Sequence, residues 1–254
     1  MSKFRNRAGL MNVDERMKEN YEHAYRTYLP KRMPVILRLD GKAFHTFTRY
    51  MKKPFDTDLI LLMQDITKYL LANIQNAVLG YTQSDEISIL LMNYNKFTTE
   101  SWFDNNIQKM VSISAAMASA FATLEYNYNH LYDNEAVPIP PRKYIHFDSR
   151  VFVLPESEVN NYFVSRQQDC QRNSIQMIAQ SLYSHKALQN LSCKDLIEKI
   201  DKDDAVNKKY DDYDFSETHG STIIKYGAPC EYNVIEHIFK QDSSIVNALL
   251  TPEE

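Results

Sequence analysis

Branched apolar residues are concentrated in short runs that predict the strands of a sheet. The first run is "PVILRLD" (34–40), and "AVLGY" (77–81) and "EISILLM" (86–92) follow, joined by the polar residues "TQSD". Between the first two runs, apolar residues recur at helical spacing, in a segment that begins near Asp56 or Asp58. They are Leu59, Leu62, Met63, Ile66, Leu70, Ile74 and Ala77. This part of the chain therefore predicts strand, helix, strand, strand.

A second helix and a fourth strand follow. Residues 101–127 predict a helix whose middle, "VSISAAMASAFA", is rich in the small residues that let a helix lie close on a sheet. Residues 144–155, "YIHFDSRVFVLP", predict the next strand, and a short charged helix at 14–27 precedes all of these elements. The order is βαββαβ, the ferredoxin-like α+β arrangement, which gives a four-stranded antiparallel sheet with both helices on one face.

The pattern changes after the fourth strand. A long helix is predicted over 156–184, a shorter helix over 193–200, and a strand, "STIIKYG", over 221–227. We therefore predict two parts, an α+β domain formed by residues 1–155 and a mainly helical extension with a short strand, formed by residues 156–254. The extension is expected to pack on the domain.

Composition mainly narrows the function classes. The chain has 254 residues, of which 44% are hydrophobic and 24% charged, as in an ordinary globular protein. No apolar run reaches the roughly 18 residues of a membrane span. Three scattered cysteines do not make a disulfide framework, so we expect a cytoplasmic protein, while an organellar setting stays open. The net charge of −4 neither requires nor excludes a nucleic-acid partner. Five glycines in all exclude a P-loop and a dinucleotide fingerprint, so phosphates would be held by side chains and metal.

Three carboxylates stand at the ends of two predicted strands. Asp40 ends the first strand, and Asp85 and Glu86 enter the third. In the ferredoxin-like arrangement these strands are central neighbours, so antiparallel pairing would bring the acidic ends together. Clustered carboxylates repel one another, and a divalent cation makes such a cluster favourable. Oxygen ligands without His or Cys favour Mg²⁺ over Zn²⁺.

Only one of the two adjacent acids is expected to bind a shared ion. Neighbouring residues on a strand point to opposite faces, and we favour Asp85 over Glu86 as the ligand. Gly41 leaves a backbone carbonyl accessible beside the metal. Carboxylates that hold two Mg²⁺ ions are typical of phosphoryl transfer. The alternative is that these acids are turn residues or part of a polar cap.

Several segments, in this order, resemble the tRNA-His guanylyltransferase family. They are "RLDGKAFHTFTR", "KKPFD", "YTQSDEISIL", "WFDNNIQKMVSISAAMASAFA", "FDSRVFVLP" and "SRQQDCQRN", within roughly residues 33–226. The resemblance implies a polymerase-like palm domain and the addition of nucleotides to the 5′ end of tRNA in the 3′-to-5′ direction. It also implies tRNA and nucleoside triphosphates as partners, and a homotetramer. No membrane partner is expected, because no apolar run is long enough to span a membrane.

The resemblance also implies roles for individual residues. Asp40, the Gly41 carbonyl and Asp85 are implied to hold two Mg²⁺ ions, with Glu86 also needed for catalysis. The residues implied or expected to contact the nucleotide are Lys42, His45, Lys53, Ser84, Lys109 and Arg150.

The residues taken alone leave alternatives open at these positions. His45 could equally be a packed loop histidine, and Lys53 a surface lysine. Arg150 could form an ion pair with Asp148.

The predicted long helix departs from the eukaryotic pattern of the family. The eukaryotic enzymes carry His-Ile-Asn-Asn-Leu-Tyr-Asn-Thr, whereas residues 171–178 read "QRNSIQMI" and keep only Asn173. This stretch resembles the bacterial, archaeal and organellar guanylyltransferase-like proteins, which are implied to repair 5′-truncated tRNAs on a template. We expect Arg166, Arg172 and Asn173 to contact tRNA, with a solvated helix face as the alternative.

The resemblance to these proteins implies template-dependent 3′-to-5′ nucleotide addition to tRNA. ATP would activate the 5′ phosphate, and ATP, GTP or other nucleoside triphosphates would be the substrates. One alternative is a dedicated enzyme that adds the extra guanosine to tRNA-His. The others are a nucleotidyl cyclase-like enzyme that needs no RNA and a non-catalytic tRNA-binding protein. The sequence leaves open which tRNA is used and whether ATP or GTP activates it.

Overall fold

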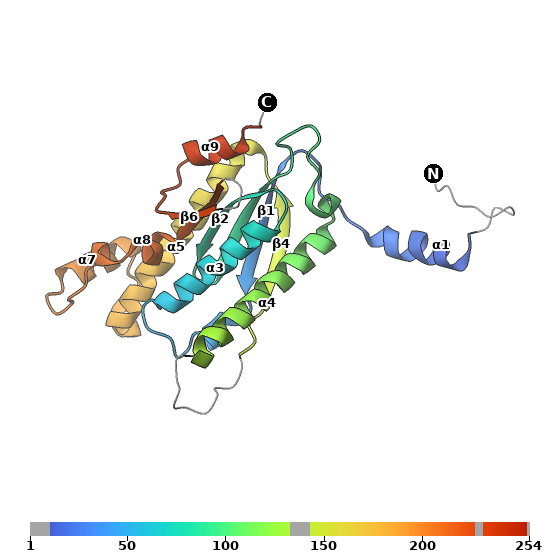
Figure 1. The fold of residues 1–254 in the computed structure, drawn as a ribbon. Helices are drawn as coiled ribbons and strands as arrows, with labels where there is room; N and C mark the ends of the chain where they lie inside the picture. The colour runs from blue at the N-terminus through green and yellow to red at the C-terminus, as the bar shows by residue number, and fades with distance from the viewer. Residues whose placement is uncertain (1–10, 133–142, 227–230, 253–254) are drawn as a thin grey trace.

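The computed structural model describes residues 11–132, 143–226 and 231–252. Its strands are β1 (Pro34–Gly41), β2 (Ala77–Gln83), β3 (Glu86–Met92), β4 (Phe147–Val153), β5 (Ser221–Tyr226) and β6 (Glu231–Ile235). Among the described residues they form one antiparallel sheet of six strands in the order β4-β1-β3-β2-β5-β6 (Figure 1). The order β4-β1-β3-β2 is the predicted ferredoxin-like order, which is confirmed, and β5 and β6 extend the sheet beyond β2.

Two helices cover one face of the sheet, as predicted. The first, α3 (Thr57–Asn73), packs on β2, and α4 (Ile107–Tyr132) packs on β4, so that they lie side by side (Figure 1). Asp56 caps α3 by accepting hydrogen bonds from two backbone N–H groups, which places the start of the helix where the sequence predicts it. The strands contribute alternate residues to this core: Val35, Leu37, Leu39, Ile87, Ile89 and Leu91.

The start of α4 differs from the prediction. Residues Trp102–Asn105 form a 3₁₀ turn, the last three of which have positive φ, and α4 begins only at Ile107. Asn105 is buried, donates a hydrogen bond to the Pro30 carbonyl and accepts one from Asn93. These side-chain hydrogen bonds favour the turn over a further turn of helix.

The opposite face of the sheet is covered by α5 (Glu156–Leu182). Val159 and Phe163 of this helix pack on Ile36 and Leu90 of the strands, together with side chains of the C-terminal segment. Burial on both faces explains why the central strands are almost continuously apolar.

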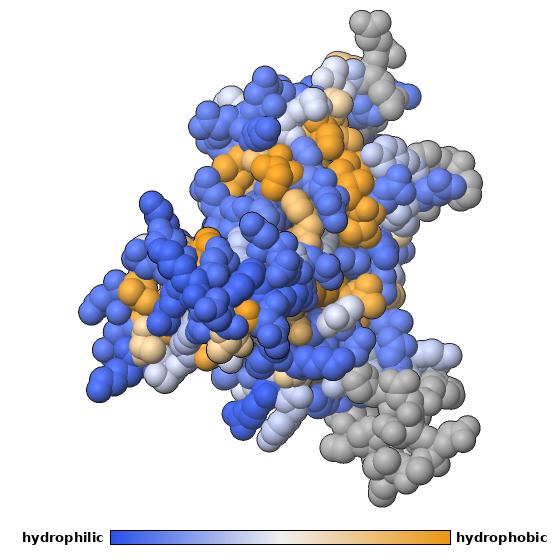
Figure 2. Space-filling view, turned by 90° about the vertical axis from the view of Figure 1, so that its left-hand side faces the viewer, coloured by the Kyte–Doolittle hydropathy of each residue, from blue (hydrophilic) through white to orange (hydrophobic). Residues whose placement is uncertain are grey.

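Shorter elements complete the C-terminal part. They are α6 (His185–Leu188), α7 (Cys193–Lys202), a 3₁₀ turn (Tyr210–Asp212), α8 (Phe215–His219) and α9 (Ser244–Leu250). Leu196 and Ile200 of α7 form a small separate core with Ile175 and Ile178 of α5. Figure 2 shows the side from which α7 projects: hydrophilic side chains cover most of it, and hydrophobic side chains gather in its upper half. Because β5 pairs with β2, the C-terminal part also contributes strands to the palm sheet.

The predicted N-terminal helix is irregular. It consists of α1 (Val13–Met17), a π-helical turn (Lys18–Glu22) and a 3₁₀ turn (His23–Tyr25), and none of their residues is buried. Figure 1 shows α1 projecting away from the sheet.

Among the described residues, one helix is long and apolar enough to pass a test for crossing a membrane. The sequence alone did not single it out. It is residues 107–129 of α4. Core helices of water-soluble proteins pass the same test, and Met110, Ala118 and Ala122 are fully buried in the core between α4 and the sheet. The finding therefore carries no membrane assignment.

The close contact between α3 and β2 yields a stability prediction. A Cβ atom at Gly80 would lie 2.4 Å from Cγ2 of Thr67, so Gly80→Ala is expected to lower the free energy of unfolding by about 1–3 kcal/mol. Urea denaturation measures this change. Thr67→Ser removes the methyl group but keeps the hydroxyl that donates to the Met63 carbonyl, so the double variant should recover most of the loss. An equal loss in the single and double variants would contradict this account.

Candidate active site

The acidic ends of β1 and β3 meet at one end of the sheet, as predicted. Asp40 of β1 pairs in register with Glu86 of β3. Asp85 lies in the two-residue turn between β2 and β3, where Ser84 has a φ of 50°. The Gly41 N–H donates a 3.0 Å hydrogen bond to the Asp85 carbonyl, so the end of β1 contacts this turn directly.

Asp40 and Asp85 carry charge that the protein does not compensate. Burial raises the pKa of the Asp85 carboxyl, and the charge of Asp40 raises it further, against smaller opposing effects from hydrogen bonds. Within the described ranges, no Lys, Arg or His forms an ion pair with either acid. Two carboxylates beside the backbone of Gly41 are hard oxygen donors, which fits Mg²⁺. In the described part of the chain, no three or more His, Cys, Asp or Glu residues are placed together so that they could hold a metal ion, so a site here would rest on these two acids and on backbone oxygens.

Glu86 has a different environment. Its side chain is 7% exposed, and one carboxylate oxygen accepts hydrogen bonds from Arg38 of β1 and from Arg166 of α5, the latter at 3.3 Å. Burial raises the pKa of Glu86, while the two guanidinium groups lower it. Two guanidinium groups thus face one oxygen of Glu86, while its Oε1 atom is buried without a hydrogen-bond partner among the described residues. In the part of the chain that the structure describes, Asp85 faces no such cation, which leaves it as the better-placed ligand of the two adjacent acids.

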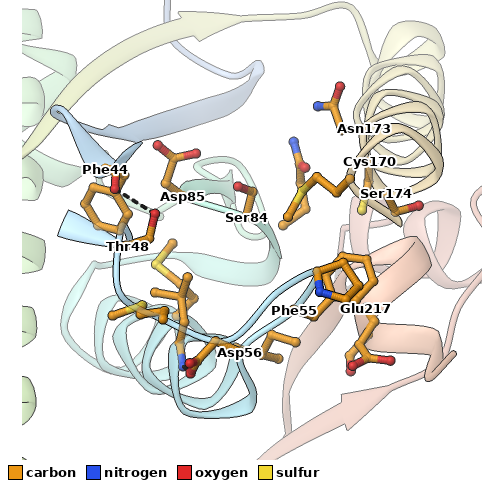
Figure 3. A pocket seen from close by; sticks show the side chains of 18 of the residues that line it. Phe44, Thr48, Phe55, Asp56, Ser84, Asp85, Cys170, Asn173, Ser174 and Glu217 are labelled. Atoms are coloured by element: carbon orange, nitrogen blue, oxygen red, sulfur yellow. Dashed lines mark hydrogen bonds between the residues drawn. The ribbon is translucent and has the colours of Figure 1, made fainter. Parts of the chain in front are cut away.

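A cavity of about 310 Å³ lies beside Asp85 (Figure 3). Residues 44–63, which include α2 (Phe44–Phe47) and the first turns of α3, form one wall. The turn with Ser84 and Asp85 lies across the cavity from α5. The lining side chains of α5 are Cys170, Asn173, Ser174 and Met177.

The cavity combines apolar walls with a few polar groups, as nucleotide-sized sites usually do. Its apolar residues include Phe44, Met51, Phe55, Leu59 and Met63. Phe55 makes an edge-to-face ring contact with Tyr213 at 5.7 Å, beside the small core of α5 and α7. The C-terminal part therefore anchors the loop that carries Lys53.

Several predicted residues line this cavity. The cavity lining includes His45, Lys53 and Ser84, which were predicted to contact the nucleotide. It also includes Asn173, which was predicted to contact tRNA. His45 is exposed rather than packed, and its Nε2 atom lies 3.1 Å from the Thr46 hydroxyl.

Two other predicted nucleotide contacts do not line the cavity. Lys42 is exposed, and its backbone N–H donates to the His146 carbonyl at 2.8 Å. Arg150 forms a 3.4 Å ion pair with Asp148, the alternative that the residues alone suggested, and both side chains are more than half exposed.

Lys109 lies near the opposite end of the sheet. It lies in the first turn of helix α4. Asn105, just before this helix, accepts a hydrogen bond from Asn93, and Asn93 directly follows the end of β3 that is opposite to Glu86. Seven strand residues at about 3.3 Å each separate the two ends by roughly 20 Å. The Lys109 ammonium lies 5.7 Å from the centre of the Phe103 ring. Lys109 accordingly does not line the cavity beside Asp85.

The predicted tRNA contacts differ in exposure. The Arg166 side chain is 17% exposed, and it contacts Asp169 at 3.6 Å as well as Glu86. The Arg172 side chain is 60% exposed and also bonds Asp169. The Arg172 side chain is thus more accessible to RNA than that of Arg166, while Asn173 is half-buried, as Arg166 is.

Sequence reasoning missed the contribution of α8 to the cavity. Ser216 and Glu217 of α8 line it, and so does Ser221, the first residue of β5. Glu217 accepts a hydrogen bond from the Asp214 N–H at 2.8 Å and completes a capping box at the start of α8. The sequence signal was the Asp-x-x-Glu spacing in the acid-rich segment, which predicts a helix start.

Comparisons with known proteins agree with this geometry. The sequence model of the tRNAHis guanylyltransferase (Thg1) family matches residues 14–155, more than half of the chain. Solved structures of a bacterial tRNA(His) guanylyltransferase (Thg1)-like protein, in complex with ATP and with GTP, are 41% and 38% identical. The match to the ATP complex covers 95% of this chain and 100% of the bacterial chain, with a TM-score of 0.85. The match to the GTP complex covers 94% of this chain and 99% of the bacterial chain, with a TM-score of 0.75.

Curated relatives match over shorter stretches. An uncharacterized protein, R259, of Acanthamoeba polyphaga mimivirus is 27% identical over 205 residues, which are 75% of this chain and 70% of the relative. The probable tRNA(His) guanylyltransferase of Homo sapiens is 28% identical over 145 residues, 56% of this chain and 45% of the human protein. The match thus spans less than half of the human relative. Together with the structures, the family match shows that this chain belongs to the tRNAHis guanylyltransferase family.

Proposed function

We propose that this protein is a nucleotidyltransferase that extends the 5′ ends of tRNAs in the 3′-to-5′ direction and repairs truncated ends on a template. Family membership supports nucleotide addition to tRNA. The observation that carries the proposal is the uncompensated pair Asp40 and Asp85 beside a cavity of nucleotide size. Such a pair is suited to phosphoryl transfer when a divalent cation is bound.

Asp40, Asp85 and the Gly41 carbonyl are the groups that would hold Mg²⁺. Bound there, the ion would neutralise phosphate charge and activate the attacking oxygen. His45 and Lys53 line the cavity, where their donors and charge can stabilise the phosphates of a bound nucleotide. No nucleophilic side chain is needed, because this chemistry rests on positioning and electrostatics.

The proposed reaction has two displacement steps. First, an oxygen of the tRNA 5′ monophosphate attacks the α-phosphorus of ATP, which forms an adenylylated 5′ end and releases pyrophosphate. Next, the 3′ hydroxyl of a nucleoside triphosphate, paired with a template base, attacks the activated 5′ phosphate. A phosphodiester bond forms, AMP leaves, and the hydroxyl proton passes to solvent.

The choice of repair rests on likeness to the bacterial proteins. Their solved structures are 38–41% identical over nearly the whole chain, against 28% over 145 residues for the human relative. Residues 171–178 of α5 also lack most of the eukaryotic pattern. A dedicated enzyme that adds the extra guanosine to tRNA-His is the second candidate, supported by the relatives named for that activity.

An extension assay tests the proposal. The protein is incubated with Mg²⁺, ATP and all four nucleoside triphosphates, and with two 5′-monophosphorylated tRNAs. One is tRNA-His without its extra guanosine, and the other is an unrelated tRNA without its first nucleotide. We expect the unrelated tRNA to be extended, with the added base following the template. Asp85→Asn should lower the rate by about 10²–10³-fold, and Asp201→Asn on the exposed face of α7 is the matched control.

The other outcomes of this assay are equally informative. Extension of tRNA-His alone would support the dedicated guanylyltransferase. Triphosphate turnover to a cyclic product without RNA would support a cyclase. Absence of any extension by the wild-type protein would overturn the proposed activity.

Asp85→Asn should stabilise the metal-free protein. Folding raises the pKa of the Asp85 carboxyl. The contribution of this group to stability is therefore complete at pH values below its pKa in the unfolded chain, and it is lost as pH rises through its pKa in the folded protein. At pH 7 in EDTA, the variant lacks this charge and should therefore have a higher Tm than the wild type. Mg²⁺ should then raise the Tm of the wild type and not of the variant. A lower Tm for the variant in EDTA would contradict this expectation.

A further inference from the structure

We infer that Glu86 is a positioning residue that fixes α5 against β3 through Arg166, and that it thereby sets the α5 wall of the cavity rather than binding metal. This inference rests on the proposed function, since it concerns the same cavity. It gives a separate role to the acid that stands next to Asp85 in the sequence.

Glu86 is the centre of a partly buried group of charges. Its Oε2 atom accepts hydrogen bonds from Nη2 of Arg38 and from Nη1 of Arg166. The exposed fractions of the three side chains are 7%, 24% and 17%, respectively. Arg166 also contacts Asp169, one helical turn further along α5. The guanidinium groups thus join β1, β3 and α5 at one carboxylate.

A second polar contact beside it fixes the register of the helix. The hydroxyl of Ser88 lies 2.7 Å from that of Tyr162. From Glu86 to Ser88 the strand advances by about 6.6 Å, and from Arg166 back to Tyr162 the helix covers about 6 Å. Because these spacings match, both contacts form together only when α5 lies in one register on β3.

This register determines what the cavity presents to a nucleotide. Cys170 follows Arg166 by one turn of α5, and Asn173 and Ser174 follow by two turns on the same side of the helix. All three line the cavity across from Asp85. A shift of α5 along β3 would therefore move this wall relative to the acids that would hold the metal.

The charges argue against Glu86 as a metal ligand. A divalent cation at its carboxylate would lie beside two guanidinium groups, and like charges repel strongly where water is excluded. Asp85, by contrast, has no cationic partner within the described ranges. The two adjacent acids therefore have different tasks.

A double-mutant cycle tests the inference in the full-length protein. The variants are Glu86→Gln, Arg166→Met and the two combined, and each is measured for ATP affinity, for KM and kcat in tRNA extension, and for Tm. The Mg²⁺ midpoint is read from the Mg²⁺-dependent rise in Tm without nucleotide. The control is Lys202→Met, which removes an exposed ion pair with Glu198 on α7.

We expect both single variants to weaken ATP binding by about tenfold and to raise KM more than they lower kcat. The double variant should be no weaker than the worse single variant, because both changes break the same contact. The Mg²⁺ midpoint should stay unchanged in all three, and the control should match the wild type throughout.

Other results would overturn the positioning role. A shift of the Mg²⁺ midpoint in Glu86→Gln but not in Arg166→Met would make Glu86 a metal ligand. Additive losses, or unchanged ATP affinity in both single variants, would also contradict it. If Glu86→Gln does not fold, Arg166→Met alone decides by its ATP affinity and Mg²⁺ midpoint. A wild-type protein that binds no ATP would contradict the proposed function, and this inference with it.

Discussion

The repulsion between Asp40 and Asp85 is the constraint on which the site depends. Antiparallel pairing of β1 and β3 brings the two acids to one end of the sheet, and burial makes their shared charge costly. The apolar strands beneath them are packed from both faces, so the acids cannot easily move apart. The fold thus maintains an unfavourable electrostatic interaction that a bound cation can relieve.

The cavity beside these acids is assembled from parts that are distant in the chain. Loop residues after β1 form one wall, while α5 and α8 supply the others. Two contacts hold these walls in place: Phe55 packs against Tyr213, and Glu86 binds Arg166. The chain after the palm strands is therefore part of the site. This is consistent with likeness to the bacterial proteins over nearly the full length of the chain.

The sequence predicted the strand order and the meeting of Asp40 with the β2–β3 turn, because apolar periodicity and connection rules depend on local pattern. It did not predict the ion pair between Glu86 and Arg166, which joins residues 80 positions apart and depends on the packing of α5. The contribution of α8 to the cavity was missed for the same reason. Lys109 was assigned by resemblance to its segment, and only the fold shows that α4 begins near the far end of the sheet.

The proposed activity depends on the binding of a divalent cation by Asp40 and Asp85. Electron paramagnetic resonance of Mn²⁺, added to the protein without nucleotide, measures that binding most directly because bound and free ions give different signals. We predict saturable binding by the wild type and by Asp201→Asn, and its loss in Asp40→Asn and in Asp85→Asn. Equal binding by all four proteins would contradict the assignment of the site.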